Sequence, residues 1–136
     1  YRLEWTPDYV AWYVDGQLVR RLEGEQVESL DNAQSARFNL WAANVASWVG
    51  PFEPENLPVY QRVDWIRYYA YSEESGDFVF AWEDEFDRLD TSRWALADWT
   101  FAENLTDFAP ENVTVEDGFL VLALTRAEES GAPEER

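Results

Sequence analysis

Short strand-forming runs joined by tight turns constrain the fold of this chain more than any other feature of its sequence. Two Asp-Gly pairs, at residues 15–16 and 117–118, each separate two runs rich in Val, Leu and aromatic residues. Asp-Gly between such runs is among the strongest short-range signals for a two-residue β-hairpin turn. The strands expected around these turns are Tyr9–Val14, Gln17–Arg21, Asn112–Val115 and Phe119–Thr125.

Further extended segments lie before the first hairpin and between the two hairpins. Strands are expected at Tyr1–Trp5, Ala36–Trp41, Gln61–Tyr71 and Phe78–Trp82, with a short extended piece around Trp99 and Phe101. Loops are expected at Gly24–Gln34, Ala42–Pro58 and Arg88–Ala97, and no segment has the pattern of a long helix. Many short strands without helices predict an all-β chain, built as a two-sheet sandwich or jelly roll.

The missing residue types exclude several kinds of chemistry. The sequence has no Cys and no His, which excludes disulfides, thiolate metal sites, histidine-ligated zinc and histidine-dependent nucleophilic triads. Acid–base chemistry would therefore depend on carboxylates. Met is also absent, so Tyr1 is not expected to be a natural translation start, and we expect a processed chain or a fragment cut inside a fold.

The charge and the aromatic content favour a neutral polymeric partner. The net charge is −18, all ten basic residues are arginines, and such a chain repels nucleic acid and anionic membranes. A charge of this size is equally well explained by solubility or by adaptation to high salt. Aromatic residues make up 17% of the chain, and Trp and Tyr present flat apolar faces of the kind on which sugar rings pack.

Several sequence motifs occur in a fixed order along the chain. They are Leu3-Glu4-Trp5-Thr6-Pro7, Trp12-Tyr13-Val14-Asp15-Gly16, Arg37-Phe38-Asn39-Leu40-Trp41, Trp48-Val49-Gly50, Val63-Asp64-Trp65-Ile66-Arg67-Tyr68, Phe86-Asp87, Ser92-Arg93-Trp94, Asp98-Trp99-Thr100-Phe101 and Asp117-Gly118-Phe119-Leu120-Val121-Leu122. In these motifs the chain resembles glycoside hydrolase family 16, whose members are two-sheet β jelly rolls of the concanavalin-like type. Residues 1–71 resemble the last third of that family, and residues 77–127 resemble its first third.

This order implies a circularly permuted and incomplete family fold. The C-terminal part of the fold (1–71) precedes a short linker (72–76), which is followed by the N-terminal part (77–127) and a polar acidic tail (128–136). Permutation is physically reasonable, because domain termini often lie close enough for a short linker to join them. The resemblance is to the permuted endo-1,3-1,4-β-glucanases (licheninases) of the family.

The catalytic motif of the family is absent from this sequence. Family members carry Glu-x-Asp-x-Glu on one strand, and alternation places the three carboxylates on one face, where two of them act as nucleophile and acid/base. The nearest sequence is Glu83-Asp84-Glu85-Phe86-Asp87, which aligns with a different strand and which we interpret as a solvated acidic strand end. No catalytic residue is therefore assigned, and the chain alone is expected to be inactive.

The resemblance also implies substrate-binding and metal-binding residues. Trp41 and Trp48 match tryptophans that line the cleft on its reducing-end side, while Trp99 and Asn104 match positions on the non-reducing-end side. From the residues alone, Trp41 is equally compatible with a core position and Asn104 with a turn. A neighbouring basic residue of the close relatives is replaced here by Leu105.

A structural calcium ion is a further implication of the resemblance. The matching positions are Asp64, Glu85 and Gly118, which would offer two carboxylates and a backbone carbonyl. Oxygen ligands of this kind suit Ca²⁺.

Three accounts of function follow from the sequence. The first is the larger part of a retaining endo-β-1,3-1,4-glucanase, secreted or periplasmic in a bacterium, which binds β-glucan. The second is a non-catalytic β-glucan-binding module. The third is a complementing fragment that folds with a separate chain supplying the catalytic segment, because missing strands would leave sheet edges unpaired.

Overall fold

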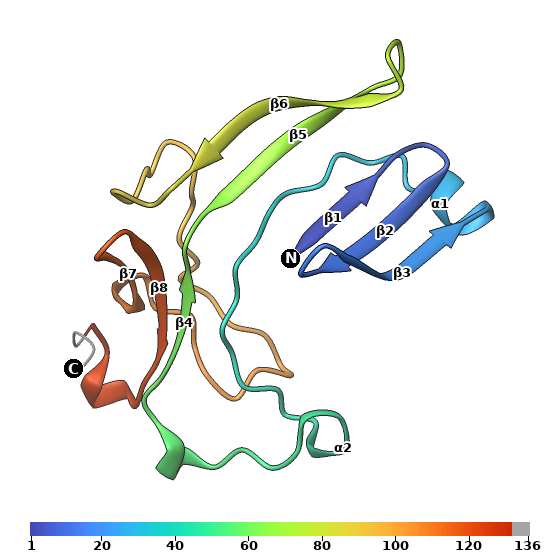
Figure 1. Ribbon diagram of the computed structural model, residues 1–136. Coiled ribbons are helices and arrows are strands. Elements are labelled where there is room, and N and C mark those ends of the chain that lie inside the picture. Colours follow the sequence, from blue (N-terminus) through green and yellow to red (C-terminus); the bar gives the residue numbers. More distant parts are fainter. Residues whose placement is uncertain (132–136) are drawn as a thin grey trace. The chain divides into compact units, whose positions relative to one another are not determined.

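The computed structural model describes residues 1–131 and shows an all-β chain with only very short helices (Figure 1). None of the helices in this part of the chain has the length and apolar character needed to cross a membrane. The strands are β1 (Arg2–Trp5), β2 (Tyr9–Val14), β3 (Gln17–Glu23), β4 (Val59–Val63), β5 (Ile66–Ser72), β6 (Asp77–Asp84), β7 (Val113–Glu116) and β8 (Phe119–Leu124). The helical turns are α1 (Glu25–Glu28), α2 (Ala46–Val49), η1 (Pro54–Asn56), η2 (Pro110–Asn112) and η3 (Ala127–Glu129).

The chain divides into two compact units, which are described separately. Unit 1 contains residues 1–37 and 68–81, and unit 2 contains residues 38–67 and the chain from residue 82 onward. The sheet pairs for which the register is defined are all antiparallel, as a jelly roll requires. The all-β prediction is therefore confirmed. The two units do not coincide with the sequence parts 1–71 and 77–127, because each unit combines segments from both parts.

Unit 1 is built on the first predicted hairpin. β2 lies between β1 and β3, with Val10 opposite both Trp5 and Leu22. Asp15 and Gly16 have φ values of 51° and 76°, the left-handed conformations that a tight hairpin turn of this kind needs. The Asp-Gly signal is confirmed here.

One face of this sheet carries a network of tyrosine, glutamate and arginine. The Glu4 carboxylate accepts hydrogen bonds from the hydroxyls of Tyr9 (3.2 Å) and Tyr13 (3.1 Å). The guanidinium of Arg2 stacks 3.9 Å from the Tyr13 ring centroid, and that of Arg21 stacks 3.6 Å from the Tyr9 centroid. Desolvation and then the hydrogen bond to Glu4 raise the pKa of the Tyr9 phenol. The network ties all three strands together across one face.

The opposite face of the same sheet is only partly covered. Val10 is 5% exposed, and Val27 of α1, the helical turn that follows β3, is 3% exposed. Farther along the face, Leu3 is 61% exposed and its cross-strand partner Trp12 is 37% exposed. Within the described residues, this sheet therefore presents an apolar surface that its own unit leaves in contact with solvent.

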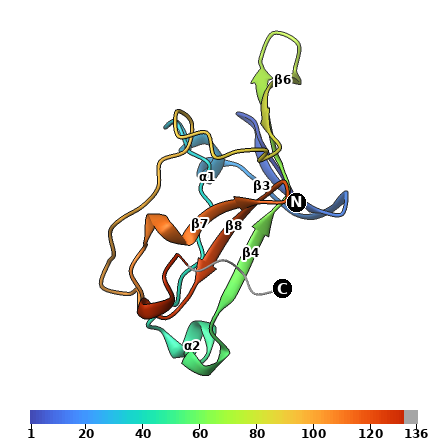
Figure 2. The same ribbon diagram turned by 90° about the vertical axis from the view of Figure 1, so that its left-hand side faces the viewer.

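Unit 2 is built on the second predicted hairpin. β8 lies between β4 and β7, and Leu120 pairs with Val63 on one side and with Val115 on the other (Figure 2). Asp117 and Gly118 at the turn have φ values of 52° and 80°, which confirms the second Asp-Gly turn. Leu120 and Leu122 of β8 are buried because the strand has neighbours on both sides and a core on one face.

The core of unit 2 is centred on Phe86, the one large side chain of the described residues that is fully buried. Its ring lies 6.2 Å from Phe38 and 6.0 Å from Trp94 between centroids. The Asp84 carboxylate fixes this arrangement. One oxygen accepts the Phe86 backbone N–H at 3.0 Å, and the other accepts the Trp94 indole N–H at 2.8 Å. Phe86 has a φ of 50°, so the hydrogen bond from its backbone supports an unfavourable conformation.

Three sequence predictions about strands are wrong or need revision. The run Gln61–Tyr71 is not one strand, since it breaks at Asp64–Trp65 into β4, which pairs with β8, and β5, which pairs with β6. Ala36–Trp41 is not a strand, although Phe38 and Leu40 pack against the core. A run of strand-forming residues does not reveal where a chain passes between sheets or buries side chains without backbone pairing.

The predicted extended piece at Trp99 and Phe101 is also not a strand. Its aromatic rings pack on one another, and the backbone contributes an isolated bridge between Asn104 and Ala43. Aromatic residues that favour strands in general are used here for side-chain packing in a loop.

Two segments predicted to connect or to leave the fold are ordered parts of it. Residues 73–76 form the turn of the β5–β6 hairpin, and the Gly76 N–H donates to the Ser72 carbonyl at 2.8 Å. The first residues of the predicted tail form η3, after which the side-chain oxygen of Asn112 accepts from the Gly131 N–H (2.7 Å) and from the Ser130 hydroxyl (3.1 Å). Residues 132–136 of the predicted tail lie outside the described residues.

The role of Asp84 predicts a large effect of Asp84→Ala on the stability of unit 2. The substitution leaves the buried Phe86 N–H and the Trp94 indole N–H without their acceptor, and we expect a loss of about 2–3 kcal/mol in the free energy of unfolding. Asp87→Ala is the matched control, since Asp87 is exposed and lies three residues away. Urea unfolding monitored by tryptophan fluorescence measures both, and equal effects of the two substitutions would contradict the assignment.

Candidate functional site

The loop that carries Trp48 has a defined local structure. Residues 46–49 form α2, with Trp48 donating its backbone N–H to the Val45 carbonyl at 2.9 Å. Gly50 ends this turn with a φ of 83°, a conformation that glycine adopts without strain. The turn holds Trp48 with 70% of its surface exposed. The indole of Trp48 is therefore accessible to a ligand.

The predicted tryptophans lie along a continuous run of aromatic rings in unit 2. Trp41 lies 6.3 Å from Trp48 and 5.1 Å from Phe101, and Phe101 lies 6.0 Å from Trp99, measured between ring centroids. Phe108 packs beside the Trp99 end of the run, with its ring centroid 5.4 Å from that of Trp99. Trp99 is 53% exposed, so both ends of the run offer an accessible indole face. The structure therefore brings Trp41, Trp48 and Trp99 together.

Backbone hydrogen bonds join the two segments that supply these rings. The Asn44 N–H donates to the Glu103 carbonyl at 2.7 Å, and the Leu105 N–H donates to the Ala42 carbonyl at 2.8 Å. These bonds flank the bridge between Ala43 and Asn104. Segments about 60 residues apart in the sequence are thereby held in register, which fixes the relative positions of Trp41 and Phe101.

Asn104 lies at this junction, and its side chain is used within the loop. Its carbonyl oxygen accepts hydrogen bonds from the Thr106 N–H (3.1 Å) and the Thr106 hydroxyl (2.9 Å), the geometry of an Asx turn. The amide nitrogen is buried and has no protein partner. Asn104 is therefore a turn residue, one of the two roles that its sequence left open, while its direct contact with a sugar stays a prediction.

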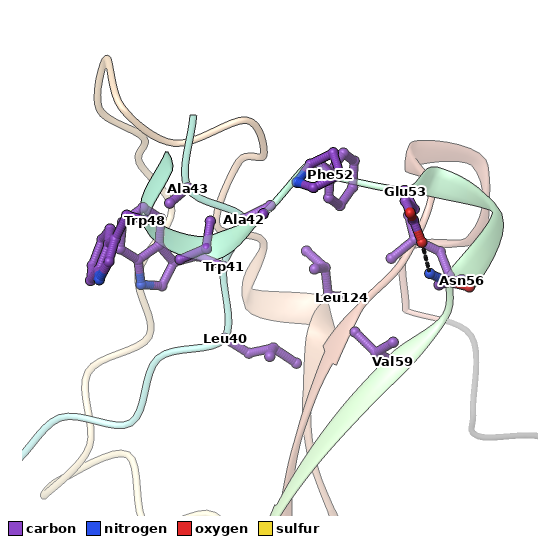
Figure 3. A pocket seen from close by; sticks show the side chains of 14 residues that line it. Leu40, Trp41, Ala42, Ala43, Trp48, Phe52, Glu53, Asn56, Val59 and Leu124 are labelled. Atoms are coloured by element: carbon purple, nitrogen blue, oxygen red, sulfur yellow. Dashed lines mark hydrogen bonds between the residues drawn. The ribbon is translucent and has the colours of Figure 1, made fainter. Parts of the chain in front are cut away.

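A pocket of about 420 Å³ opens beside Trp41 and Trp48 (Figure 3). Such a volume lies within the range of small-molecule and sugar sites, which are largely apolar with a few polar groups. Its apolar lining includes Leu40, Phe52, Val59 and Leu124, and its polar side chains are Glu53 and Asn56. The site thus combines an exposed aromatic run with an adjoining cavity.

The three residues proposed to hold calcium lie in one region of unit 2. Asp64 directly follows β4, whose last residue Val63 pairs with Leu120, and Gly118 immediately precedes β8. Glu85 precedes the buried Phe86, but its carboxylate accepts a hydrogen bond from Arg67 at 3.2 Å. Two carboxylates and one carbonyl fall short of the six to eight oxygens that Ca²⁺ takes, and the described residues contain no cluster of three acidic side chains that would hold a metal.

The acidic segment that most nearly matches the catalytic motif has a structural role. Arg67 donates to Glu83 at 2.9 Å as well as to Glu85, and Asp84 holds the core aromatic rings. Glu83 and Glu85 are exposed ion-pair partners, as the sequence analysis expected of an acidic strand end. Asp84 differs, because it is partly buried and hydrogen-bonded.

Comparisons with known proteins agree with these features. The family model described as glycosyl hydrolases family 16 matches residues 1–67. A beta-glucanase from Fibrobacter succinogenes is 48% identical over 130 residues, which cover 93% of this chain and 37% of that protein. Residues 1–67 therefore match glycoside hydrolase family 16, and nearly the whole chain is similar to part of a beta-glucanase.

Other family relatives match only about half of the chain. Beta-glucanases from Brevibacillus brevis and Bacillus subtilis are 37% and 35% identical over 70 and 69 residues, or 50% of this chain. Those alignments cover 26% and 27% of the relatives, so the chain spans well under half the length of the curated proteins it matches.

Sequence reasoning missed several residues of the site. Phe101 was placed in an extended piece and in a family motif but not in the site, yet it is the ring that connects Trp41 with Trp99. Phe108, Glu53 and Asn56 were not singled out at all. The spacing Trp99-x-Phe101 was a usable signal, whereas the approach of Glu53 to the pocket depends on how the loop turns.

The Asx turn at Asn104 predicts a measurable effect on stability. In Asn104→Ala, Thr106 loses both of its bonds to the side chain, and we expect a decrease of about 1–2 kcal/mol in the free energy of unfolding. Asn44→Ala is the control, because the hydrogen bond of Asn44 to Glu103 comes from its backbone and survives the substitution. If thermal unfolding shows that Asn104→Ala leaves the stability unchanged, the turn does not hold the loop.

Proposed function

We propose that this chain supplies the substrate-binding surface of a retaining endo-β-1,3-1,4-glucanase of glycoside hydrolase family 16. The observation that carries the proposal is the run of rings formed by Trp48, Trp41, Phe101 and Trp99, with exposed indoles at both ends. Glucosyl rings present apolar C–H faces to such indoles, and successive rings of a glucan chain would contact successive aromatic side chains.

The charge of the chain supports a neutral polysaccharide as the partner. A net charge of −18 disfavours nucleic acid, anionic membranes and acidic polysaccharides, whereas β-glucan carries no charge. The matched relatives are named beta-glucanases, which supports the same substrate class. Because a protein that binds polymeric β-glucan encounters it outside the cytoplasm, we propose that this protein is secreted or periplasmic.

The hydrolytic step requires a strand that this sequence does not contain. In retaining glycoside hydrolysis, one carboxylate forms a glycosyl-enzyme intermediate and a second acts first as the acid and then as the base. The sequence has no Glu-x-Asp-x-Glu, so we propose that this chain alone does not cleave glucan and that the catalytic segment belongs to a longer protein or to a separate chain.

The match patterns support the proposal that the family fold is circularly permuted here. The Fibrobacter protein aligns with nearly the whole chain, whereas the Bacillus-type relatives align with only half of it. A permuted order explains why one relative aligns with 93% of this chain while others align with only 50% of it.

The proposal predicts glucan binding without hydrolysis. We expect the 136-residue chain to bind barley β-glucan in affinity electrophoresis and to release no reducing sugar from it. Trp48→Ala should weaken binding by up to about tenfold, because one stacked aromatic contact contributes roughly 0.5–1.5 kcal/mol.

Trp65→Ala is the matched control, since Trp65 is 49% exposed but is not part of the aromatic run. A greater loss for Trp65→Ala than for Trp48→Ala would place binding elsewhere, and measurable release of reducing sugar would refute the inactivity of the chain. Laminarin and carboxymethylcellulose in the same assay test the preference for mixed linkages.

A structural calcium ion is a separate proposal, supported by the pairing of β4 with β8, which brings Asp64 near the turn that contains Gly118. If Ca²⁺ binds only the folded chain, calcium at a hundredfold its Kd stabilises the fold by about 2.7 kcal/mol. We therefore expect Ca²⁺ to raise the melting temperature by several degrees, EDTA to reverse the shift, and Asp64→Asn to reduce it. An unchanged melting temperature in Ca²⁺ would exclude the site, and Mg²⁺ serves as the control cation.

A further inference from the structure

The pocket beside the aromatic run continues past the tryptophans to a polar end formed by Glu53 and Asn56. We propose that this end is an additional glycosyl subsite, in which Glu53 and Asn56 recognise the hydroxyl groups of a glucosyl residue that lies beyond Trp48. The inference rests on the proposed β-glucan binding and adds a residue pair and a direction to it.

The shape of the pocket gives the subsite its place. Figure 3 shows Trp41 and Trp48 at one end of the pocket and the Glu53–Asn56 pair at the other, with Leu40, Val59 and Leu124 between them. A ligand that stacks on Trp48 and continues along the pocket therefore crosses apolar side chains before it reaches the carboxylate.

The polar pair is arranged so that hydrogen-bonding capacity remains for a ligand. The Asn56 amide donates to one Glu53 carboxylate oxygen at 2.9 Å. This bond orients both side chains and leaves the second carboxylate oxygen and the amide carbonyl as acceptors. Two acceptors side by side match adjacent sugar hydroxyls, each of which has a proton to donate.

The local backbone supports the pair. Asn56 and Glu53 lie at the two ends of η1, and the Asn56 N–H donates to the Glu53 carbonyl at 3.0 Å. Pro54 occupies the first position of this turn and restricts its backbone. The two side chains are therefore held on a short rigid turn, which lowers the entropy that a ligand would have to overcome on binding.

The composition of the pocket selects a neutral polyhydroxylated ring among possible occupants. The side chains of Glu53 and Asn56 are exposed, and a purely apolar ligand lying over them would remove water from the carboxylate oxygen that Asn56 does not contact, which is costly. An anion would meet that carboxylate directly. A glucosyl ring has an apolar face for Leu40, Val59 and Phe52 and hydroxyl groups for Glu53 and Asn56, so it satisfies both parts of the lining.

Oligosaccharides of different length test the subsite. The probes are a β-linked gluco-disaccharide and a mixed-linkage β-gluco-hexasaccharide, titrated against the full chain by isothermal calorimetry. We expect Glu53→Ala to weaken hexasaccharide binding by about tenfold or more, because hydrogen bonds to a charged group are lost. Binding of a disaccharide that stacks on Trp48 without extending to Glu53 should not change.

Glu55→Ala is the matched control, since Glu55 belongs to the same turn and is exposed but does not line the pocket. It should leave both affinities unchanged, and equal melting temperatures of the variants show that the turn is intact. Asn56→Ala should resemble Glu53→Ala.

The outcomes separate the two proposals. If the wild-type chain binds the hexasaccharide and Trp48→Ala weakens it while Glu53→Ala does not, the subsite is refuted and the proposed function stands. If Glu53→Ala weakens both probes equally, the pair does not act at an end position and the inference is also refuted. If neither probe binds to the wild-type chain, the proposed function fails and the subsite fails with it.

Discussion

The two hydrogen bonds that the Asp84 carboxylate accepts are the interactions on which unit 2 depends. The carboxylate satisfies the backbone N–H of a fully buried phenylalanine and the indole N–H of Trp94, and so it connects the end of β6 with the loop that follows. Phe86 then packs on Leu120 and Leu122, which positions the β8 sheet. A partly buried carboxylate stabilises the fold when its hydrogen bonds are made, and here both oxygens of Asp84 have a donor.

Local chemistry in the sequence was enough to predict the hairpins. Asp15-Gly16 and Asp117-Gly118 fold as predicted, because a two-residue turn with positive φ values is encoded almost entirely by its own residues. The break at Asp64–Trp65 was not predictable in the same way. Whether a run of strand-forming residues continues in one sheet or changes to another depends on partners far away in the chain. β4 ends at Val63, the last of its residues to pair with β8, where the partner is Leu120.

The candidate site shows the same division. The exposed position of Trp48 followed from its place in a loop with prolines, and the resemblance supplied Trp41 and Trp99. The sequence did not reveal how these tryptophans are connected. Phe101 reaches Trp41 only because the backbone bonds at Ala43 and Asn104 bring two distant segments together. Asn104 was predicted to contact a sugar, whereas the carbonyl oxygen of its side-chain amide accepts a hydrogen bond within the loop.

The three-stranded sheet of unit 1 has β1 and β3 as its outer strands, and Leu18 and Val19 of β3 are 53% and 65% exposed. An outer strand with free backbone groups and apolar side chains is a template on which a second polypeptide can add. Mutual repulsion between copies that each carry a net charge of −18 opposes such addition. Because that repulsion weakens as the Debye length shrinks, dissolved salt controls the colloidal behaviour of this chain, and purification at low ionic strength favours the dispersed monomer.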